Sequence, residues 1–329
     1  IACRSCPERN STRPRFSALN KPVFAFVFLV LLTTTVWLLT PPRLEQLAPD
    51  AAPSQPMPKT IAGLIPDTES RIVWANGEAR TPWAVVTLHG FSATRQETAP
   101  LAETVASLLG ANLYEARLTG HGLAEQPLTG VRAEDWLQDA ADALAAGAAI
   151  GDKIIVIGTS TGATLAAAML DHELAKQIDT LVMISPNFEP RDPGARWLTR
   201  PAGPLLARLA VGDTRCWEPH NELQARFWST CYPTAAAVEM TRLVDRANQL
   251  LPASIPQRLL MFYSRGDTVI SPKAALEIFD ATASPQKAVL EITDSGDPSQ
   301  HVLAGDILSP ATTRSMAETI AGFIERPTP

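Results

Sequence analysis

The sequence beyond residue 58 alternates short apolar runs, rich in β-branched residues, with segments of helical pattern. The runs are IVWA at 72–75, WAVVTL at 83–88, IIVIG at 154–158, TLVMIS at 180–185, RLLMFYS at 258–264 and AVLEIT at 288–293. Continuous apolar runs of this length are typical of strands buried on both faces. Helices are expected between them, over about 97–109, 132–149, 161–176, 272–280 and 310–325. This alternation predicts an α/β fold with a mostly parallel central sheet and helices on both faces.

One long interval breaks the alternation. From about residue 188 to residue 256 no central strand is evident, and aromatic residues concentrate in a segment of helical character. They are Trp197, Trp217, Phe227, Trp228 and Tyr232. Because the interval lies between two predicted strands, we expect a helical cap inserted into the α/β domain. Most of these aromatic side chains are expected to form the core of the cap, and some of the first four to line a substrate pocket.

The first 58 residues have a different character. Residues 23–40 contain no charged side chain, and as a helix rising about 1.5 Å per residue they would span about 27 Å, close to the thickness of a bilayer. Basic residues dominate the segment before them, so the positive-inside rule predicts a cytoplasmic segment over residues 1–22. A single transmembrane signal anchor over 23–40 and a proline-rich linker over 41–58 would then hold residues 59–329 outside the cytoplasm.

A cleaved signal peptide is the main alternative for the apolar stretch, and a buried helix of a soluble protein is a further one. Such peptides normally have an apolar region of only about 7 to 15 residues, followed by a small-x-small cleavage site. No such site follows residue 40, which favours the uncleaved anchor. Under the anchor and the signal-peptide interpretations alike, residues 59–329 are exported.

Composition limits the classes of partner. A chain of 329 residues, 46% of them hydrophobic, can form one large α/β domain. The net charge of −6 leaves no basic surface on average, so a nucleic-acid partner is not expected. Cys216 and Cys231 would lie in an oxidising exterior and could form a disulfide, although their spacing alone does not establish one. The sequence does not predict an oligomeric state.

The pentapeptide Gly158-Thr159-Ser160-Thr161-Gly162 stands between a predicted strand and a predicted helix. Serine becomes a nucleophile when a base accepts its proton, and a sharp strand-to-helix turn exposes its hydroxyl group. Glycines suit such a turn because it leaves little room for side chains. The position of the motif therefore marks Ser160 as a candidate nucleophile, with the free N–H groups of a helix start beside it.

Several further motifs lie before and after Ser160 in the chain. They are Leu88-His89-Gly90-Phe91 at the end of a strand, Arg117-Leu118-Thr119-Gly120-His121-Gly122, Asp135-Trp136, Gly266-Asp267 after a late strand, and His301 near the end. Together with the Ser160 turn, over residues 80–325, they resemble the α/β-hydrolase family, and within it the carboxylesterases and monoacylglycerol lipases. The chain departs from the commonest family pattern in having Thr161 and Ala163 after the serine, instead of methionine and glycine.

The resemblance implies a catalytic triad of Ser160, Asp267 and His301, in the order expected for this fold. Asp294 and Asp297 are rival acids, but they precede His301 in the same loop and do not follow a separate strand. The resemblance also implies an oxyanion hole formed by the backbone N–H groups of Phe91 and Thr161.

The four remaining histidines are assigned other roles. His89 and His121 lie in glycine-containing loop motifs, where the resemblance implies structural hydrogen bonds. His172 follows an aspartate in an expected helix and should face solvent, and His220 falls in the cap, where it could at most touch substrate.

No metal or nucleotide motif is present, because the sequence contains no Walker loop, no H-E-x-x-H and no G-x-G-x-x-G after a strand. No cofactor and no metal site are therefore expected. The leading hypothesis is hydrolysis of small to medium apolar acyl esters. Amide or peptide hydrolysis or acyl transfer by the same triad is the alternative. A catalytically idle binding protein of the same fold is a further one, which the complete Ser, Asp and His set disfavours.

Overall fold

The computed structural model describes residues 21–39 and 61–326, which belong to two separate units divided between residues 41 and 42. In the first unit, α1 (Lys21–Leu39) covers most of the apolar stretch. Among the described residues, no helix is both long and apolar enough to cross a membrane. The transmembrane anchor expected over 23–40 is therefore not found. The expected cytoplasmic segment, except for its last two residues, and the linker over 41–58 lie outside the described residues.

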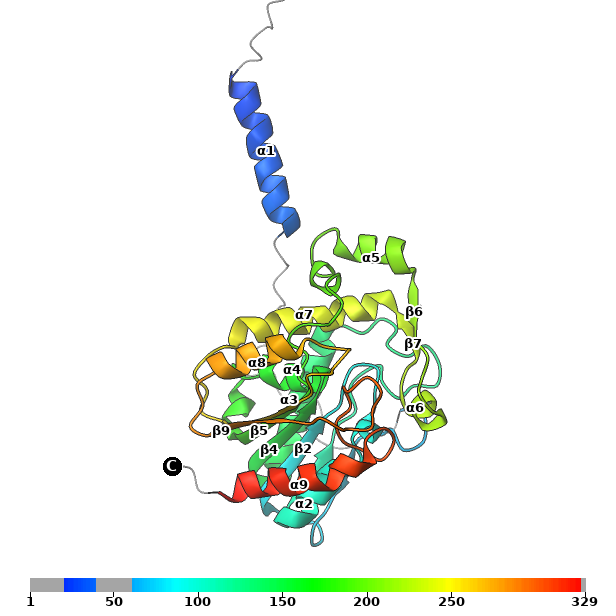
Figure 1. Ribbon diagram of the computed structural model, residues 1–329, viewed down its shortest axis with the longest axis vertical. Helices are drawn as coiled ribbons and strands as arrows, with labels where there is room; N and C mark the ends of the chain where they lie inside the picture. Colours follow the sequence, from blue (N-terminus) through cyan, green and yellow to red (C-terminus); the bar gives the residue numbers. More distant parts are fainter. Residues whose placement is uncertain (1–20, 40–60, 327–329) are drawn as a thin grey trace, which may run out of the picture. The chain divides into compact units, whose positions relative to one another are not determined.

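The second unit is built on a seven-stranded sheet with the order β1-β3-β2-β4-β5-β8-β9 (Figure 1). Its strands are β1 (Arg71–Val73), β2 (Thr81–Leu88), β3 (Asn112–Glu115), β4 (Gly151–Thr159), β5 (Ile178–Ile184), β8 (Arg258–Tyr263) and β9 (Lys287–Glu291). Only β1 pairs antiparallel with its neighbour, and the other neighbouring pairs are parallel. The expected mostly parallel sheet is confirmed.

Helices cover both faces of the sheet, as the continuous apolar runs predict. Neighbouring residues of one strand serve opposite cores: Val85 packs with α2 (Leu101–Leu109) and α9 (Pro310–Glu325), whereas Val86 packs on the other face. The helices of that other face are α3 (Ala133–Ile150), α4 (Thr161–Ala168), α7 (Thr234–Leu250) and α8 (Pro272–Ala281). The sheet is thus the middle layer of three.

Some element boundaries differ from those expected. The helix predicted over 97–109 begins at Leu101, because residues 95–97 form a separate 3-10 turn and Pro100 occupies the N-cap position of α2. The helix predicted over 161–176 ends at Ala168, and a separate 3-10 turn covers Glu173–Gln177. Strand β3 was missing from the apolar runs, because its sequence Asn-Leu-Tyr-Glu begins and ends with polar residues.

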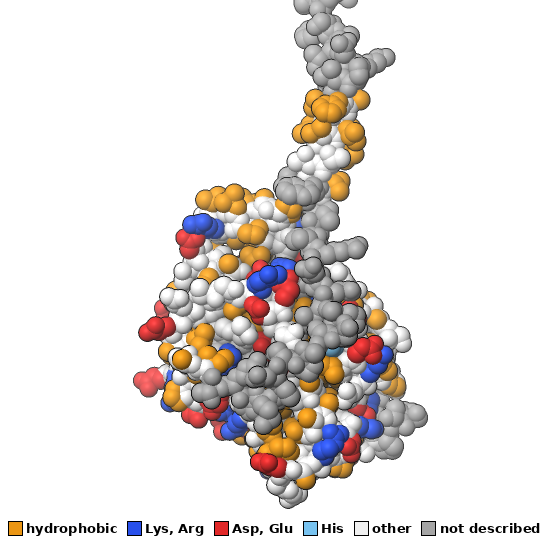
Figure 2. Space-filling view, turned by 180° about the vertical axis from the view of Figure 1, so that it is seen from behind, with side chains coloured by type: hydrophobic (Ala, Val, Ile, Leu, Met, Phe, Trp, Pro, Cys, Tyr) orange, Lys and Arg blue, Asp and Glu red, His pale blue; other side chains and the backbone are white. Residues whose placement is uncertain are grey.

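An inserted segment between β5 and β8 stands where the cap was expected. It contains α5 (Gly203–Val211), β6 (Thr214–Cys216), α6 (Glu222–Phe227), β7 (Cys231–Pro233) and α7. On α5 four apolar side chains face solvent. They are Leu205, Leu206, Leu209 and Val211. Figure 2 shows hydrophobic side chains gathered at the end of the second unit where α5 lies. The segment is therefore helical in part, with a small β-hairpin added.

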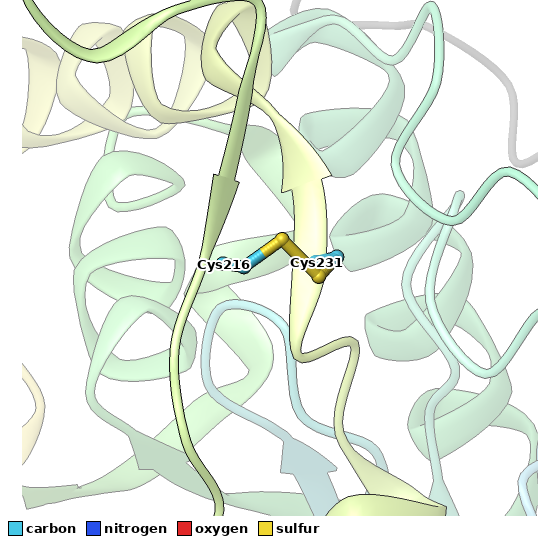
Figure 3. The surroundings of a disulfide bond; sticks show 2 residues. All are labelled: Cys216 and Cys231. Carbon is cyan, nitrogen blue, oxygen red and sulfur yellow. A yellow bond between two sulfur atoms is a disulfide. The ribbon is translucent and has the colours of Figure 1, made fainter.

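The hairpin is cross-linked by a disulfide. Strands β6 and β7 pair antiparallel, which places Cys216 directly opposite Cys231, and the two sulfur atoms are bonded (Figure 3). The bond closes a loop that includes α6 and both Phe227 and Trp228. The hairpin could not be read from the sequence, because each strand has only three residues.

Candidate active site

The turn between β4 and α4 holds Ser160 in a conformation that few residues other than glycine adopt. Its φ is +52° and its ψ is −118°, a strained combination that persists only where the surroundings impose it. Its N–H donates to the carbonyl of Ile184 at 2.8 Å, and its own carbonyl accepts from the N–H of Ala163 at 3.1 Å. Strand β5 and the first turn of α4 thus fix the backbone of the candidate nucleophile.

The two flanking glycines are required by close backbone contacts. A Cβ on Gly158 would lie 2.6 Å from the Cα of Ala163. A Cβ on Gly162 would lie 2.5 Å from the carbonyl carbon of Leu88 and 2.6 Å from the carbonyl oxygen of His89. All three distances are shorter than non-bonded contacts allow, so only glycine fits. The start of α4 consequently lies directly on the end of β2.

Asp267 and His301 meet at the carboxyl edge of the sheet. Asp267 follows β8 and is buried, and its Oδ1 accepts from the N–H groups of Val269 and Ile270 at 2.8 and 2.9 Å. Its Oδ2 is bound by Nδ1 of His301 at 2.7 Å. These backbone bonds fix the carboxylate, so that it can orient the imidazole ring.

The loops that carry the three residues are in contact. Ser185, directly after β5, donates from Oγ to the carbonyl of His301 at 2.8 Å, and the preceding residue, Ile184, binds the N–H of Ser160. One short segment therefore connects the nucleophile turn to the histidine loop. The arrangement brings the sequence-predicted Ser160, Asp267 and His301 to one edge of the sheet.

Electrostatics favour a charged form of His301. Burial alone would lower its pKa, but the adjacent Asp267 carboxylate, and at longer range Glu97 and Asp297, raise the pKa above its usual value of 6.5. A carboxylate that stabilises the imidazolium is the arrangement a proton-accepting histidine needs.

The rival acids serve other purposes. Asp297 is buried, and its Oδ2 accepts from the N–H groups of His301 and Val302 at 3.0 and 2.8 Å. Burial would raise its pKa, but these bonds and those from Ser299 lower it. Asp297 thus shapes the histidine loop and does not bond to the imidazole ring. Asp294 is exposed.

The two candidate oxyanion donors are free. In the part of the chain that the structure describes, neither the N–H of Thr161 nor that of Phe91 donates to a protein acceptor. The Phe91 loop is held by two buried histidines: His89 accepts from the N–H of Leu118 at 3.1 Å, and His121 accepts from the N–H of Ser92 at 3.1 Å. Burial lowers the pKa of His89 to about 4, so it is neutral. These are the structural bonds expected for both.

Two other histidines differ in their surroundings. His172 was expected in solvent but is buried, because the helix ends before it and its Nδ1 accepts from the N–H of Leu174 at 3.2 Å. His220, in the inserted segment, is exposed.

The four aromatic pocket candidates separate into distinct groups. Phe227 and Trp228 are buried in a cluster with Ala93, of the oxyanion loop, and Val302, next to His301. Trp217 packs partly buried against the same cluster. Trp197 is 48% exposed.

A crevice of different composition lies beside the oxyanion donors. It is lined by Phe91, Leu118, His121, Trp136, Thr161, Leu165 and Leu243, and it leaves no room for a water molecule. None of the four predicted pocket aromatics lines it, and their role in binding substrate stays a prediction. Five of its residues belong to motifs of the family resemblance, but no motif includes Leu165 or Leu243, and the sequence did not indicate that these segments enclose a common crevice.

The fold and this edge of the sheet are those of an α/β hydrolase. A family model described as serine aminopeptidase, S33, matches residues 79–295, and the chain belongs to that family. Within residues 21–39 and 61–326, no three His, Cys, Asp or Glu side chains are grouped so that they could hold a metal ion.

Curated and solved relatives are similar at low identity. A thermostable monoacylglycerol lipase from Bacillus sp. (strain H-257) is 25% identical over 219 residues, which cover 65% of this chain and 82% of the relative. A structure reported for the metagenome-derived lipolytic enzymes LipS and LipT has a TM-score of 0.65 at 21% identity, covering 80% of this chain and all of the other. The monoacylglycerol lipase of Paleococcus ferrophilus has a TM-score of 0.58 at 14% identity, covering 78% and 97% of the two chains.

Proposed function

We propose that the protein is a serine carboxylic-ester hydrolase that works through an acyl-enzyme. The observation that carries the proposal is the buried Asp267–His301 pair beside a strained nucleophile turn with two free amides. In the first step Oγ of Ser160 attacks the ester carbonyl carbon and Nε2 of His301 accepts the hydroxyl proton. The alkoxide that forms is bound by the N–H groups of Phe91 and Thr161.

The remaining steps use the same groups in reverse. The imidazolium of His301 gives its proton to the leaving alcohol as the carbon–oxygen bond breaks, which leaves an acyl group on Ser160. A water molecule then attacks the acyl-enzyme and gives a proton to His301. The carboxylic acid departs when that proton returns to Oγ.

Small to medium apolar acyl groups are the proposed substrates. The crevice beside Phe91 and Thr161 has apolar walls and is closed in this state, so an acyl chain must displace side chains to enter. The relatives named as monoacylglycerol lipases and as a lipolytic enzyme support an ester over an amide. Amide or peptide hydrolysis is the second candidate, which the description of the family as a serine aminopeptidase favours.

The catalytic unit is proposed to work outside the cytoplasm. The bonded pair Cys216–Cys231 supports this location, because structural disulfides persist in oxidising compartments and are rare in the cytosol.

A substrate panel on the full chain tests the proposal. It compares p-nitrophenyl esters of graded acyl length, monoacylglycerols and aminoacyl amides, with Ser160→Ala as the control. We expect the highest kcat/KM on an ester and a loss of roughly 10⁴-fold or more in the variant. Highest activity on an aminoacyl amide would favour the second candidate. Wild-type protein that neither turns over any substrate nor reacts with a fluorophosphonate probe would overturn the serine-hydrolase mechanism.

A further inference from the structure

A buried acid that no sequence motif marks lies beneath the oxyanion loop. Glu97, on the 3-10 turn Arg95–Glu97, is only 3% exposed, and its Oε2 accepts from the N–H of Gly90 at 2.6 Å. A Cβ on Gly90 would lie 2.7 Å from Oε1 of the same carboxyl group. Both carboxyl oxygens are therefore packed directly against this glycine.

Gly90 stands between two peptide groups, and both of them are held. The N–H on its amino side is bound by Glu97. On its carboxyl side, the Gly90 carbonyl lies 2.9 Å from Nδ1 of His89. Because Nε2 of His89 accepts from Leu118, Nδ1 carries the proton and donates it to this carbonyl. That second peptide ends in the N–H of Phe91.

The same acid is also in contact with the loop that carries the base. Gly305 lies against the turn of Glu97, since a Cβ there would be 2.5 Å from the Glu97 carbonyl oxygen. The N–H of Asp306 donates to the carbonyl of Ala99 at 2.8 Å. Glu97 is thus placed between the oxyanion loop and the histidine loop.

We propose that Glu97 is a positioning residue of the active site. Its carboxyl group fixes the peptide directly before the one that presents the Phe91 N–H to the oxyanion, and it adds negative charge beside the loop that carries His301. The inference rests on the proposed ester hydrolysis. Glycine turns more freely about its backbone bonds than other residues, so without the bond to Glu97 the Phe91 amide is held through His89 alone and its direction is less well fixed.

The charges around Glu97 affect its own pKa, and the charge of Glu97 affects the pKa of His301. Burial raises the pKa of Glu97 to about 7, while the bond from Gly90 and the charge of His301 lower it and Asp297 raises it. On its own turn, the nearest cation, Arg95, faces Glu69 and Glu115. The carboxylate of Glu97 in turn raises the pKa of His301. Loss of this charge should therefore let His301 act as a base at lower pH.

Two substitutions separate the hydrogen bond from the charge. Glu97→Ala removes both, whereas Glu97→Gln keeps an acceptor for Gly90 and removes the charge. Glu239 provides a control, because its Oε2 also accepts from a backbone N–H, that of Ala133 at 3.0 Å. Within the described residues it has no hydrogen bond or ion pair to the oxyanion loop, and it is also paired with Arg242. The measurements on the full chain are kcat, KM and the pH profile of kcat/KM with a short-chain p-nitrophenyl ester.

We expect Glu97→Ala to lower kcat about tenfold or more with KM nearly unchanged, since a small misplacement of a catalytic group is costly. Glu97→Gln should keep kcat within about threefold of wild type and shift the acid limb of the profile to lower pH. Glu239→Ala and Glu239→Gln should change neither.

Three results would overturn the role of Glu97. One is a Glu97→Ala variant with wild-type kcat and pH profile. Another is a Glu97→Gln variant that loses as much activity as Glu97→Ala. If Glu97→Ala does not fold, an unshifted acid limb in Glu97→Gln is decisive. Wild-type protein that hydrolyses no ester would instead refute the proposed function, and the role of Glu97 with it.

Discussion

Nδ1 of His301 lies 2.7 Å from Oδ2 of Asp267, although 34 residues separate them in the chain. Strands β8 and β9 are parallel neighbours, so the loops after them leave the sheet at the same edge. Asp267 follows the first strand directly, and His301 lies in the loop after the second. The topology of the sheet therefore brings the acid to the base.

This pair predicts a specific pH dependence. The pKa of His301 is raised above 6.5, so the imidazole stays protonated to higher pH and gains its base form only above that value. The kcat/KM of wild type should therefore fall on the acid side with a midpoint above pH 6.5. In Asp267→Asn burial still lowers the pKa of the ring, so the limb should move to lower pH, and kcat should fall roughly 10⁴-fold. A limb that does not move would show that another group sets it.

Gly162→Ala tests the contact between α4 and β2. The added methyl group meets backbone atoms of Leu88 and His89, which cannot move without shifting a strand. We expect the free energy of unfolding to fall by about 3 kcal/mol or more in denaturant titrations. Gly322→Ala is the control, because it lies in α9 with no atom within 4 Å of the new methyl group. It should raise stability by up to about 1 kcal/mol.

Removal of the disulfide should affect both stability and catalysis. The double substitution Cys216→Ser and Cys231→Ser opens a loop of sequence separation 15, which is worth about 3 kcal/mol in the chain-entropy model. The opened loop includes Ser229, whose N–H donates to Ser92 at 2.7 Å, and it adjoins Tyr232, whose ring lies 5.0 Å from that of Phe91. We expect a lower melting temperature and a lower kcat. The prediction would be contradicted if the double variant and the reduced wild-type protein both kept the melting temperature and kcat of the oxidised wild type.

Two tryptophans of the inserted segment should behave differently. Trp228 is buried against the oxyanion and histidine loops, so Trp228→Ala should cost about 3–5 kcal/mol of stability and reduce kcat/KM. Trp197 is 48% exposed, so Trp197→Ala should change stability by no more than about 0.5 kcal/mol. Paired denaturation and kinetic measurements check this. Equal effects of the two substitutions would mean that the cluster does not support the site.

Sequence patterns predicted the layers of the fold because apolar runs and helical periodicity reflect burial on both faces of a sheet. They missed β3, whose end residues Asn112 and Glu115 are buried for reasons found only in three dimensions. Asn112 donates to the carbonyls of Ala79 and Ile150, and Glu115 is paired with Arg71. Such partners lie far apart in the chain and leave no local signal.

The residues of the candidate site also fall into two groups, those that sequence motifs mark and those that they do not. Ser160, Asp267 and His301 stand at strand ends or in the loops after them, where ordered motifs mark them. Glu97 belongs to no motif, because its importance comes from a single bond to a backbone amide. The exposure of Trp197 and the contribution of Leu243 to the crevice depend on how the inserted segment folds back, which its composition does not determine.

The backbone contact of Gly162 with Leu88 and His89 holds the start of α4 against the end of β2. One of the two proposed oxyanion donors lies in or next to each of these segments. Because backbone touches backbone there, this contact does not depend on the identity of neighbouring side chains. It therefore does not require the methionine and glycine of the commonest family pattern at positions 161 and 163, where this chain has threonine and alanine. Substrate preference can change at these positions while this backbone contact is kept.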